Sequence, residues 1–259
     1  REYSWAQNID ALFFQESSPL QNEFNALYAS LFRNPQPYIE IIKALGTKKV
    51  GMTRSEIILA TKLNLGGQLT TILEELEQCD FIRSFHALGK NKKEMTYQLI
   101  DNFTLFYFQF MANYTRSSAY WSQKINQPQF NTWSGFAYER VCMQHIEQIK
   151  QAIGISGIAS SVYSWQYTPK NENEKGTQID MLIDREDRTI NLCEIKYSQG
   201  EYEISEAYDK VLREKLSIFQ QATKTKKGVS LLMITSYGLK RNQWANNIHI
   251  QLTMDDLFV

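Results

Sequence analysis

The chain has 259 residues, 43% of them hydrophobic and 13% aromatic, which is enough for one large domain or two modest ones with packed cores. Basic and acidic residues number 28 each. This balance lacks the overall positive charge of a dedicated nucleic-acid binder, although a local basic face remains open. No apolar run is long enough to predict a membrane span, and we see no secretory pattern. The chain has an odd number of widely spaced cysteines: Cys79, Cys142 and Cys193. This favours free, buried thiols in a reducing compartment over disulfides, so we expect a cytoplasmic protein.

The first half of the chain has the pattern of consecutive helices. Residues 1–18 carry apolar side chains in a broadly helical rhythm, and residues 21–32 repeat them at i, i+3, i+4 and i+7. Further helices are predicted at 38–45 and 68–79. Another begins at Thr53, where a Thr-x-x-Glu capping box satisfies amide groups at the helix start.

Two short strands, 81–85 and 95–100, follow these helices and are joined by a polar turn rich in lysine. This order is that of a winged helix, a nucleic-acid-binding module. The expected recognition helix, 68–79, bears three glutamates and no lysine or arginine. An acidic helix is poorly suited to contact the negatively charged phosphates of DNA. Docking of a protein on this helix therefore stays open. The residues expected to contact DNA are Arg54 and the wing lysines Lys90, Lys92 and Lys93.

The second half of the chain changes character after an aromatic segment, 103–111, which predicts a buried connecting helix. The segment has helical spacing without interleaved basic residues, so core packing is favoured over base stacking. A helix, three strands, a helix and two strands then follow, an order that predicts a mixed sheet flanked by helices. Their expected ranges are 133–153, 161–167, 178–183, 189–197, 205–222, 229–235 and 248–252. On the second helix we expect Ala207, Val211, Leu212, Leu216 and Phe219 to point inward.

Two features offer weaker chemistry. Residues 46–53 have the glycine spacing of a phosphate-binding loop, but Met52 replaces the lysine and the segment lies between helices, so we expect no ATP site there. His145 lies on the apolar side of the long helix and is expected to be a core histidine.

Asp180, Glu194 and Lys196 form the most informative group. Alternate residues of a strand share a face, so Glu194 and Lys196 point the same way. A polar turn near Glu186 folds the preceding strand back, which places Asp180 nearly opposite Glu194. Charged groups in an apolar sheet are costly unless they pair or bind something. Two carboxylates suit Mg²⁺ or Mn²⁺, and a neighbouring lysine suits an attacking water or a phosphate.

These residues also carry a family resemblance. Gly176-Thr177-Gln178-Ile179-Asp180 followed by Cys193-Glu194-Ile195-Lys196 resembles the core motif of the PD-(D/E)XK nuclease superfamily. An acidic residue on the preceding helix often completes the metal site there, and Glu139 matches that element. The resemblance implies that Asp180, Glu194 and Glu139 bind Mg²⁺ or Mn²⁺ and that Lys196 orients water. Lys215 on the following helix either faces this site or lies on the surface.

Several segments of the first half extend the resemblance. They are similar to the C-terminal half of archaeal-type AAA ATPases, in which an ATPase domain precedes a winged helix and a nuclease-like domain: Leu12-Phe13-Phe14, Thr53-Arg54-Ser55-Glu56, Gly66-Gly67, Phe81-Ile82-Arg83 and Asp101-Asn102-Phe103. The resemblance implies that 1–18 is the tail of a missing ATPase domain, which alone would bind ATP. It further implies a winged helix with a connecting helix at 19–115 and a restriction-endonuclease-like mixed sheet at 116–259. The fold class of the whole chain would then be α+β or α/β.

The leading hypothesis is thus a metal-dependent, DNA-cleaving module with a winged-helix docking domain. The first alternative is a catalytically degenerate nuclease fold that binds DNA or a protein without cutting. The second is a unit for self-association or partner docking, suggested by residues 103–111 and the acidic helix. Each of these three hypotheses predicts that the partner is DNA or protein and not a membrane.

Overall fold

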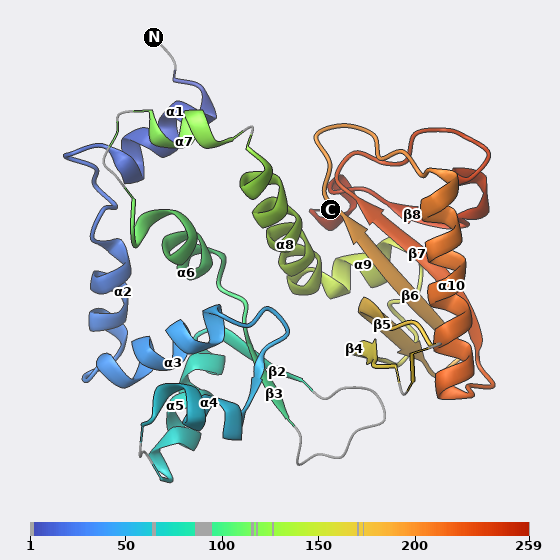
Figure 1. The fold of residues 1–259 in the computed structure, drawn as a ribbon, viewed down its shortest axis with the longest axis horizontal. Coiled ribbons are helices and arrows are strands. Elements are labelled where there is room, and N and C mark those ends of the chain that lie inside the picture. Colours follow the sequence, from blue (N-terminus) through green and yellow to red (C-terminus); the bar gives the residue numbers. More distant parts are fainter. Residues whose placement is uncertain are drawn as a thin grey trace. The chain divides into compact units, whose positions relative to one another are not determined.

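The computed structural model describes residues 3–63, 66–85, 95–114, 117, 119–125, 127–169, 171–172 and 174–258. The described residues fall into two compact units (Figure 1). Unit 1 runs to Asn131 and unit 2 begins at Thr132. The three lysines expected at the tip of the wing, Lys90, Lys92 and Lys93, lie outside the described residues.

Unit 1 combines short helices with a small antiparallel sheet. Its helices are α1 (Trp5–Ile9), α2 (Glu23–Leu31), α3 (Gln36–Gly46), α4 (Arg54–Thr61), α5 (Gln68–Gln78), α6 (Asn102–Phe106) and α7 (Tyr120–Lys124), with π-helical turns at Asp10–Phe14 and Tyr107–Met111. The three-stranded sheet has the order β1 (Met52–Thr53), β3 (Thr96–Leu99), β2 (Ile82–Phe85). The predicted hairpin is therefore present, with β1 added to its open edge.

The start of α4 follows the sequence pattern closely. The hydroxyl of Thr53 accepts a hydrogen bond from the Glu56 amide at 3.3 Å. In return, the Glu56 carboxylate accepts one from the Thr53 amide at 2.8 Å. This is the predicted capping box, in which each residue satisfies an amide that the helix leaves unpaired.

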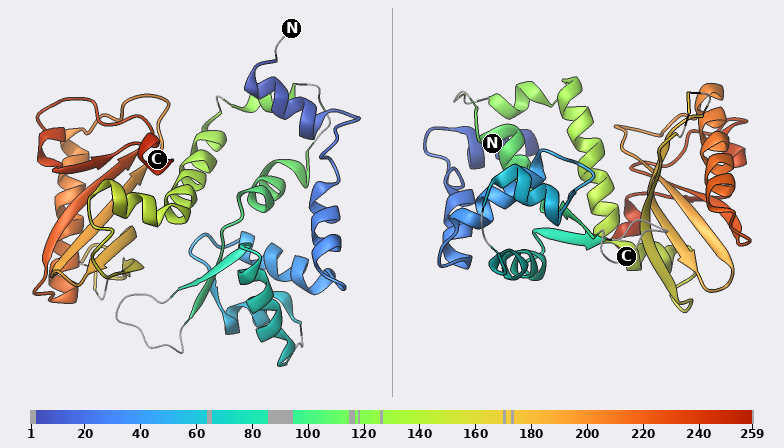
Figure 2. Two further views of the ribbon diagram at one scale, coloured as in Figure 1. Left: turned by 180° about the vertical axis from the view of Figure 1, so that it is seen from behind. Right: turned by 60° about the horizontal axis from the view of Figure 1, so that its bottom comes forward.

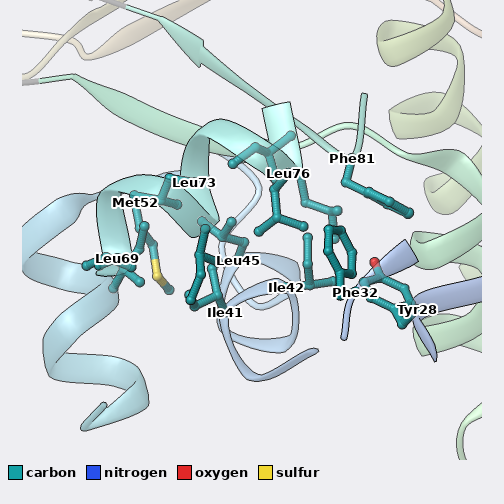
Figure 3. Packing of buried hydrophobic residues seen from close by; sticks show 14 of the residues in the cluster. Tyr28, Phe32, Ile41, Ile42, Leu45, Met52, Leu69, Leu73, Leu76 and Phe81 are labelled. Atoms are coloured by element: carbon teal, nitrogen blue, oxygen red, sulfur yellow. The ribbon is translucent and has the colours of Figure 1, made fainter. Parts of the chain in front are cut away.

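The core of unit 1 forms between α3 and α5. The four α5 residues that the sequence pattern places inward are all buried: Leu69, Ile72, Leu73 and Leu76. Figure 3 shows leucines of α5 facing Ile41 and Leu45 of α3, with Tyr28 and Phe81 at one end of the cluster. Within this cluster the hydroxyl of Tyr28 meets that of Thr104 at 3.1 Å, which satisfies both buried groups.

Two expectations for unit 1 are wrong in detail. Residues 103–111 do not form one regular helix, because α6 widens into the π-helical turn Tyr107–Met111. The wider turn changes the phase of the side chains, so Tyr107 stacks on Phe24 with ring centroids 4.0 Å apart while Phe110 packs edge-on against Trp121. Cys79 is exposed rather than buried, because it follows the last turn of α5.

Unit 2 is a mixed five-stranded sheet with helices on both sides. Its elements are α8 (Pro128–Gln144, which begins in unit 1), α9 (Ile146–Ala152), β4 (Ser160–Tyr167), β5 (Thr177–Arg185), β6 (Thr189–Lys196), α10 (Glu206–Thr223), β7 (Gly228–Thr235) and β8 (Ile250–Leu252). The strands are ordered β4-β5-β6-β7-β8; β4–β5 and β5–β6 pair antiparallel, and β6–β7 and β7–β8 pair parallel. This confirms the predicted order of elements and the mixed sheet.

The two faces of the sheet are covered by different helices. Met181, Cys193 and Ile195 pack against α8 and α9 in one cluster, which also holds both buried thiols of the unit. Leu182 and Leu192 pack on the other face against Phe219 of α10. Figures 1 and 2 show α10 lying along its face of the sheet, with α9 on the opposite side. The alternation of β6 thus assigns one face to each helix layer.

The long helix predicted at 133–153 is wrong, because the chain breaks at His145 into α8 and α9. The His145 ring nitrogen Nδ1 lies 2.7 Å from the Val141 carbonyl oxygen. In a continuous helix that carbonyl would accept a hydrogen bond from the His145 amide. The His145 amide instead donates to the Cys142 carbonyl. His145 is hydrogen-bonded as expected, but it is half-buried rather than a core residue, with its ring against Phe258.

Candidate functional site

The sheet brings Asp180 and Glu194 side by side. Met181 of β5 pairs with Cys193 of β6, so Asp180 and Glu194 are the next residues along the two strands. Both lie near the edge of the sheet where the parallel strands β6 and β7 end. Ligand sites of open α/β sheets lie outside these carboxyl ends.

A β-bulge lies at Asp180. Pairing between β4 and β5 moves from Tyr163–Leu182 to Trp165–Ile179, a step of two residues on β4 and three on β5. The extra residue interrupts the alternation, so Ile179 belongs to the cluster under α10 whereas Met181 belongs to the opposite one. Bulges redirect a side chain and are common beside active sites. Nothing in the sequence of this strand marks the bulge.

Glu194 is the centre of the polar network. Its side chain is 3% exposed, and its two carboxylate oxygens contact the ammonium groups of Lys196 at 2.7 Å and Lys215 at 2.6 Å. The hydroxyl of Tyr208 donates a third contact at 2.7 Å. Burial alone would raise the pKa of Glu194, but the two lysines outweigh it and hold this pKa below its usual value. Glu194 is therefore a buried, ionised carboxylate.

Asp180 has the opposite electrostatic setting. Burial, followed by the charges of Glu139 and Glu194, raises the pKa of Asp180 to about 6. Lys196 and Lys215 offset only part of this effect. Two acidic groups thus act on Asp180, with two lysines to balance them. The surplus negative charge favours a cation beside Asp180.

Lys196 is held in place from two sides. Burial would lower its pKa, but Glu194 and Asp180 together raise it above the ordinary value, so Lys196 is charged. Its ammonium group lies 5.6 Å from the ring centre of Tyr208, in a cation–π contact. Lys196 therefore places a fixed positive charge beside the carboxylates of Asp180 and Glu194.

The donor set fits a hard divalent cation. Among the described residues, no three His, Cys, Asp or Glu side chains are grouped closely enough to form a metal site by themselves. A closed zinc site needs such a set. Mg²⁺ and Mn²⁺ instead need only one or two carboxylate ligands and keep several waters. Two neighbouring carboxylates meet this requirement. Asp180 and Glu194 are the two neighbouring carboxylates that could serve as ligands of such an ion.

Tyr208 and Lys215 were missed or left open by sequence reasoning, and the reason lies in α10. The predicted inward face included Ala207 and Val211, which are exposed. The face that meets the sheet is instead centred on Tyr208, Leu212 and Phe219, with Lys215 among them. Polar side chains occupy positions on this face of α10 that usually carry apolar residues. A prediction based on apolar residues alone therefore places the buried face of α10 at the wrong angle around the helix axis.

Arg54 serves a structural role in unit 1. Its guanidinium donates to the Thr70 hydroxyl at 2.9 Å and to the Gly66 carbonyl at 3.1 Å, which ties α4 to the start of α5. The acidic face of α5 is also partly engaged. Glu75 accepts a hydrogen bond from Tyr38, and Glu77 accepts one from the Ser84 hydroxyl at 2.7 Å.

Comparison with known proteins adds one finding. Residues 105–207 match the family model DUF234, which is described as archaeal and bacterial proteins of unknown function. The match covers less than half of the 259 residues, from α6 to the start of α10, and it includes Glu139, Asp180, Glu194 and Lys196. No curated protein matches the chain. Across the described residues, no helix has both the length and the apolar character needed to cross a membrane.

Proposed function

We propose that unit 2 is a metal-dependent nuclease module of the PD-(D/E)XK kind that cuts phosphodiester bonds in DNA. The observation that carries the proposal is the convergence of Asp180, Glu194 and Lys196 at the carboxyl end of β6. The strand order and the acidic Glu139 on the preceding helix support the same assignment.

Each side chain has a defined part in the proposed reaction. Asp180 and Glu194 would hold Mg²⁺ or Mn²⁺, with the charge of Glu139 adding to theirs; the ion would lower the pKa of a bound water and neutralise charge on the phosphate. Lys196 orients the attacking water and donates to a phosphate oxygen. The water oxygen bonds to phosphorus and loses its proton to solvent, while the bond to the leaving sugar oxygen breaks and that oxygen takes a proton from solvent.

Lys215 and Tyr208 keep Glu194 in its working state. Their contacts at 2.6 Å and 2.7 Å fix the orientation of a carboxylate that is almost fully buried. Lys215 also balances its charge, so Glu194 stays ionised in the low-dielectric interior. The assignment of Lys215 to this site, rather than to the surface, rests on these contacts.

For unit 1 we propose a winged-helix docking domain. The succession α3, α4, α5 followed by the β2–β3 hairpin, with β1 at its open edge, supports this. The engaged Arg54 and the acidic α5 favour DNA contact through the wing rather than through α5. The resemblance to archaeal-type AAA ATPases would make both units the C-terminal half of such a protein, with ATP bound elsewhere.

Calorimetric titration of Mn²⁺ tests the proposed metal site. The wild-type protein is expected to bind one ion, and Asp180→Ala should weaken binding by at least about tenfold. Asp255→Ala, which removes an exposed carboxylate of unit 2, is the matched control and should bind normally. Equal affinity in the wild type and Asp180→Ala would overturn the assignment.

One observation favours a second candidate, a degenerate nuclease fold that binds DNA without cutting. Both oxygens of Glu194 already contact lysines of the same chain, so a metal at this residue must share them. This candidate predicts DNA binding that falls steeply with salt, as phosphate contacts require, and no cleavage. Metal-dependent cutting would exclude it.

A further inference from the structure

Thr235 is the last residue of β7 and carries an unexplained polar group. The residue is 1% exposed, and its hydroxyl oxygen Oγ1 has no hydrogen-bond partner in the part of the chain that the structure describes. A buried hydroxyl that stays unpaired is destabilising, so such groups normally bond to protein or to ordered water. An isosteric valine would leave no hydroxyl unpaired, so a threonine at this position is expected to have a hydrogen-bond partner.

The register of the sheet places Thr235 next to the candidate site. Thr235 of β7 pairs with Lys196 of β6, and Met233 pairs with Glu194. Met233 packs with Leu212 of α10, so Thr235, two residues further on, shares the α10 face with Lys196 and Glu194. Asp180 therefore lies beside Glu194 on one side of β6, and Thr235 lies beside Lys196 on the other.

The ends of these two strands are fastened together just past the pair. The Ser236 hydroxyl donates to the Ser198 carbonyl at 2.7 Å and accepts from the Ser198 amide at 2.8 Å. The Ser236 amide also bonds to the Lys196 carbonyl. Lys196 and Thr235 are thus held at a fixed separation, which neighbouring strands set at roughly 4.8 Å.

A single water molecule suits this position best. Lys196 and Thr235 make no direct hydrogen bond in the described structure, and two polar groups beyond that range are commonly bridged by water. An ammonium group has three donors, and Glu194 takes one of those of Lys196. A phosphodiester is too bulky for a hydroxyl this deeply buried, so the bridging group must be the smallest one that can both donate and accept a hydrogen bond.

We propose that Thr235 is a positioning residue of the site, whose hydroxyl and the Lys196 ammonium group together hold one water molecule. Resting on the proposed function, we further assign this water as the one that attacks the phosphate. Thr235 acts through the water and contacts neither the metal nor the reacting phosphate.

A double-mutant cycle on melting temperature tests the shared water without requiring activity. In the Lys196→Met background the Thr235 hydroxyl has no bridge, so Thr235→Val should raise the melting temperature by about 2 °C or more. In the wild-type background, and in the Lys215→Met control, Thr235→Val removes the bridge and should give no such rise. The same shift in all three backgrounds would overturn the shared water.

Cleavage kinetics test the assignment to the attacking water. Thr235→Val should lower kcat about tenfold with KM unchanged, and Thr235→Ser, which keeps the hydroxyl, should restore most of the rate. Normal kcat in Thr235→Val would overturn this assignment. A wild-type protein that cuts nothing would overturn the proposed nuclease function, and the cycle would still decide whether Thr235 and Lys196 share a water.

Discussion

Replacing Asp180 with asparagine is expected to stabilise unit 2 in neutral and alkaline solution. Burial and the carboxylates Glu139 and Glu194 raise the pKa of Asp180 from its ordinary 3.8 to about 6. The folded protein therefore holds an extra proton between about pH 4 and pH 6, and its stability falls as pH rises through this window. Asparagine resembles the protonated acid and has no charge to lose.

The size of the effect follows from the same pKa difference. At ~1.4 kcal/mol for each tenfold change in proton affinity, ionisation of Asp180 costs about 3 kcal/mol in the folded state above pH 6. Asp180→Asn should thus raise the free energy of unfolding of unit 2 by up to about 3 kcal/mol at pH 8 and change it little at pH 4.

The assay is urea denaturation at both pH values, with a chelator present to exclude metal. Pulsed hydrogen exchange on peptides from β6 and β7 reports unit 2 separately from unit 1. Asp184→Asn on the same strand is the control, because Asp184 pairs with Lys227 at 2.6 Å and should show no gain at pH 8. An Asp180→Asn effect that is equal at pH 4 and pH 8 would refute the electrostatic reasoning.

Three further variants test other parts of the structure by chemical denaturation. Lys215→Met should destabilise unit 2 by about 1–3 kcal/mol, because it leaves one oxygen of buried Glu194 without its cation, whereas Lys210→Met on the exposed side of α10 should not. Thr53→Ala should cost unit 1 about 1 kcal/mol through loss of the capping box; no loss would refute that role. Asp10→Ala should cost unit 1 about 2–4 kcal/mol, because this buried carboxylate accepts three hydrogen bonds at the start of α7, and a change below about 0.5 kcal/mol would contradict it.

Local patterns predicted the elements of both units well. The capping box at Thr53 and the apolar stripe of α5 act within a few residues, so the sequence shows them directly. The same holds for β6, whose two-residue alternation already places Glu194 and Lys196 on one face. A tight turn between β5 and β6 then brings Asp180 next to Glu194.

The rest depends on contacts between distant segments. The break between α8 and α9 comes from the His145 ring near the Val141 carbonyl, a rotamer that no periodicity reveals. Tyr208 faces the site because α10 presents a partly polar side to the sheet. Thr235 meets Lys196 only through the parallel register of β7 against β6, which links residues far apart in the chain.

Cleavage of circular and single-stranded DNA in the presence of Mn²⁺ or Mg²⁺ tests the central claim most directly. The wild type is compared with the double variant Glu194→Ala/Lys196→Ala and with the exposed-residue control Glu206→Ala/Lys210→Ala on α10. The proposed site predicts metal-dependent cutting by the wild type and the control, and none by the double variant. Cutting that survives in the double variant, or a wild type that cuts neither DNA with either metal, would contradict it.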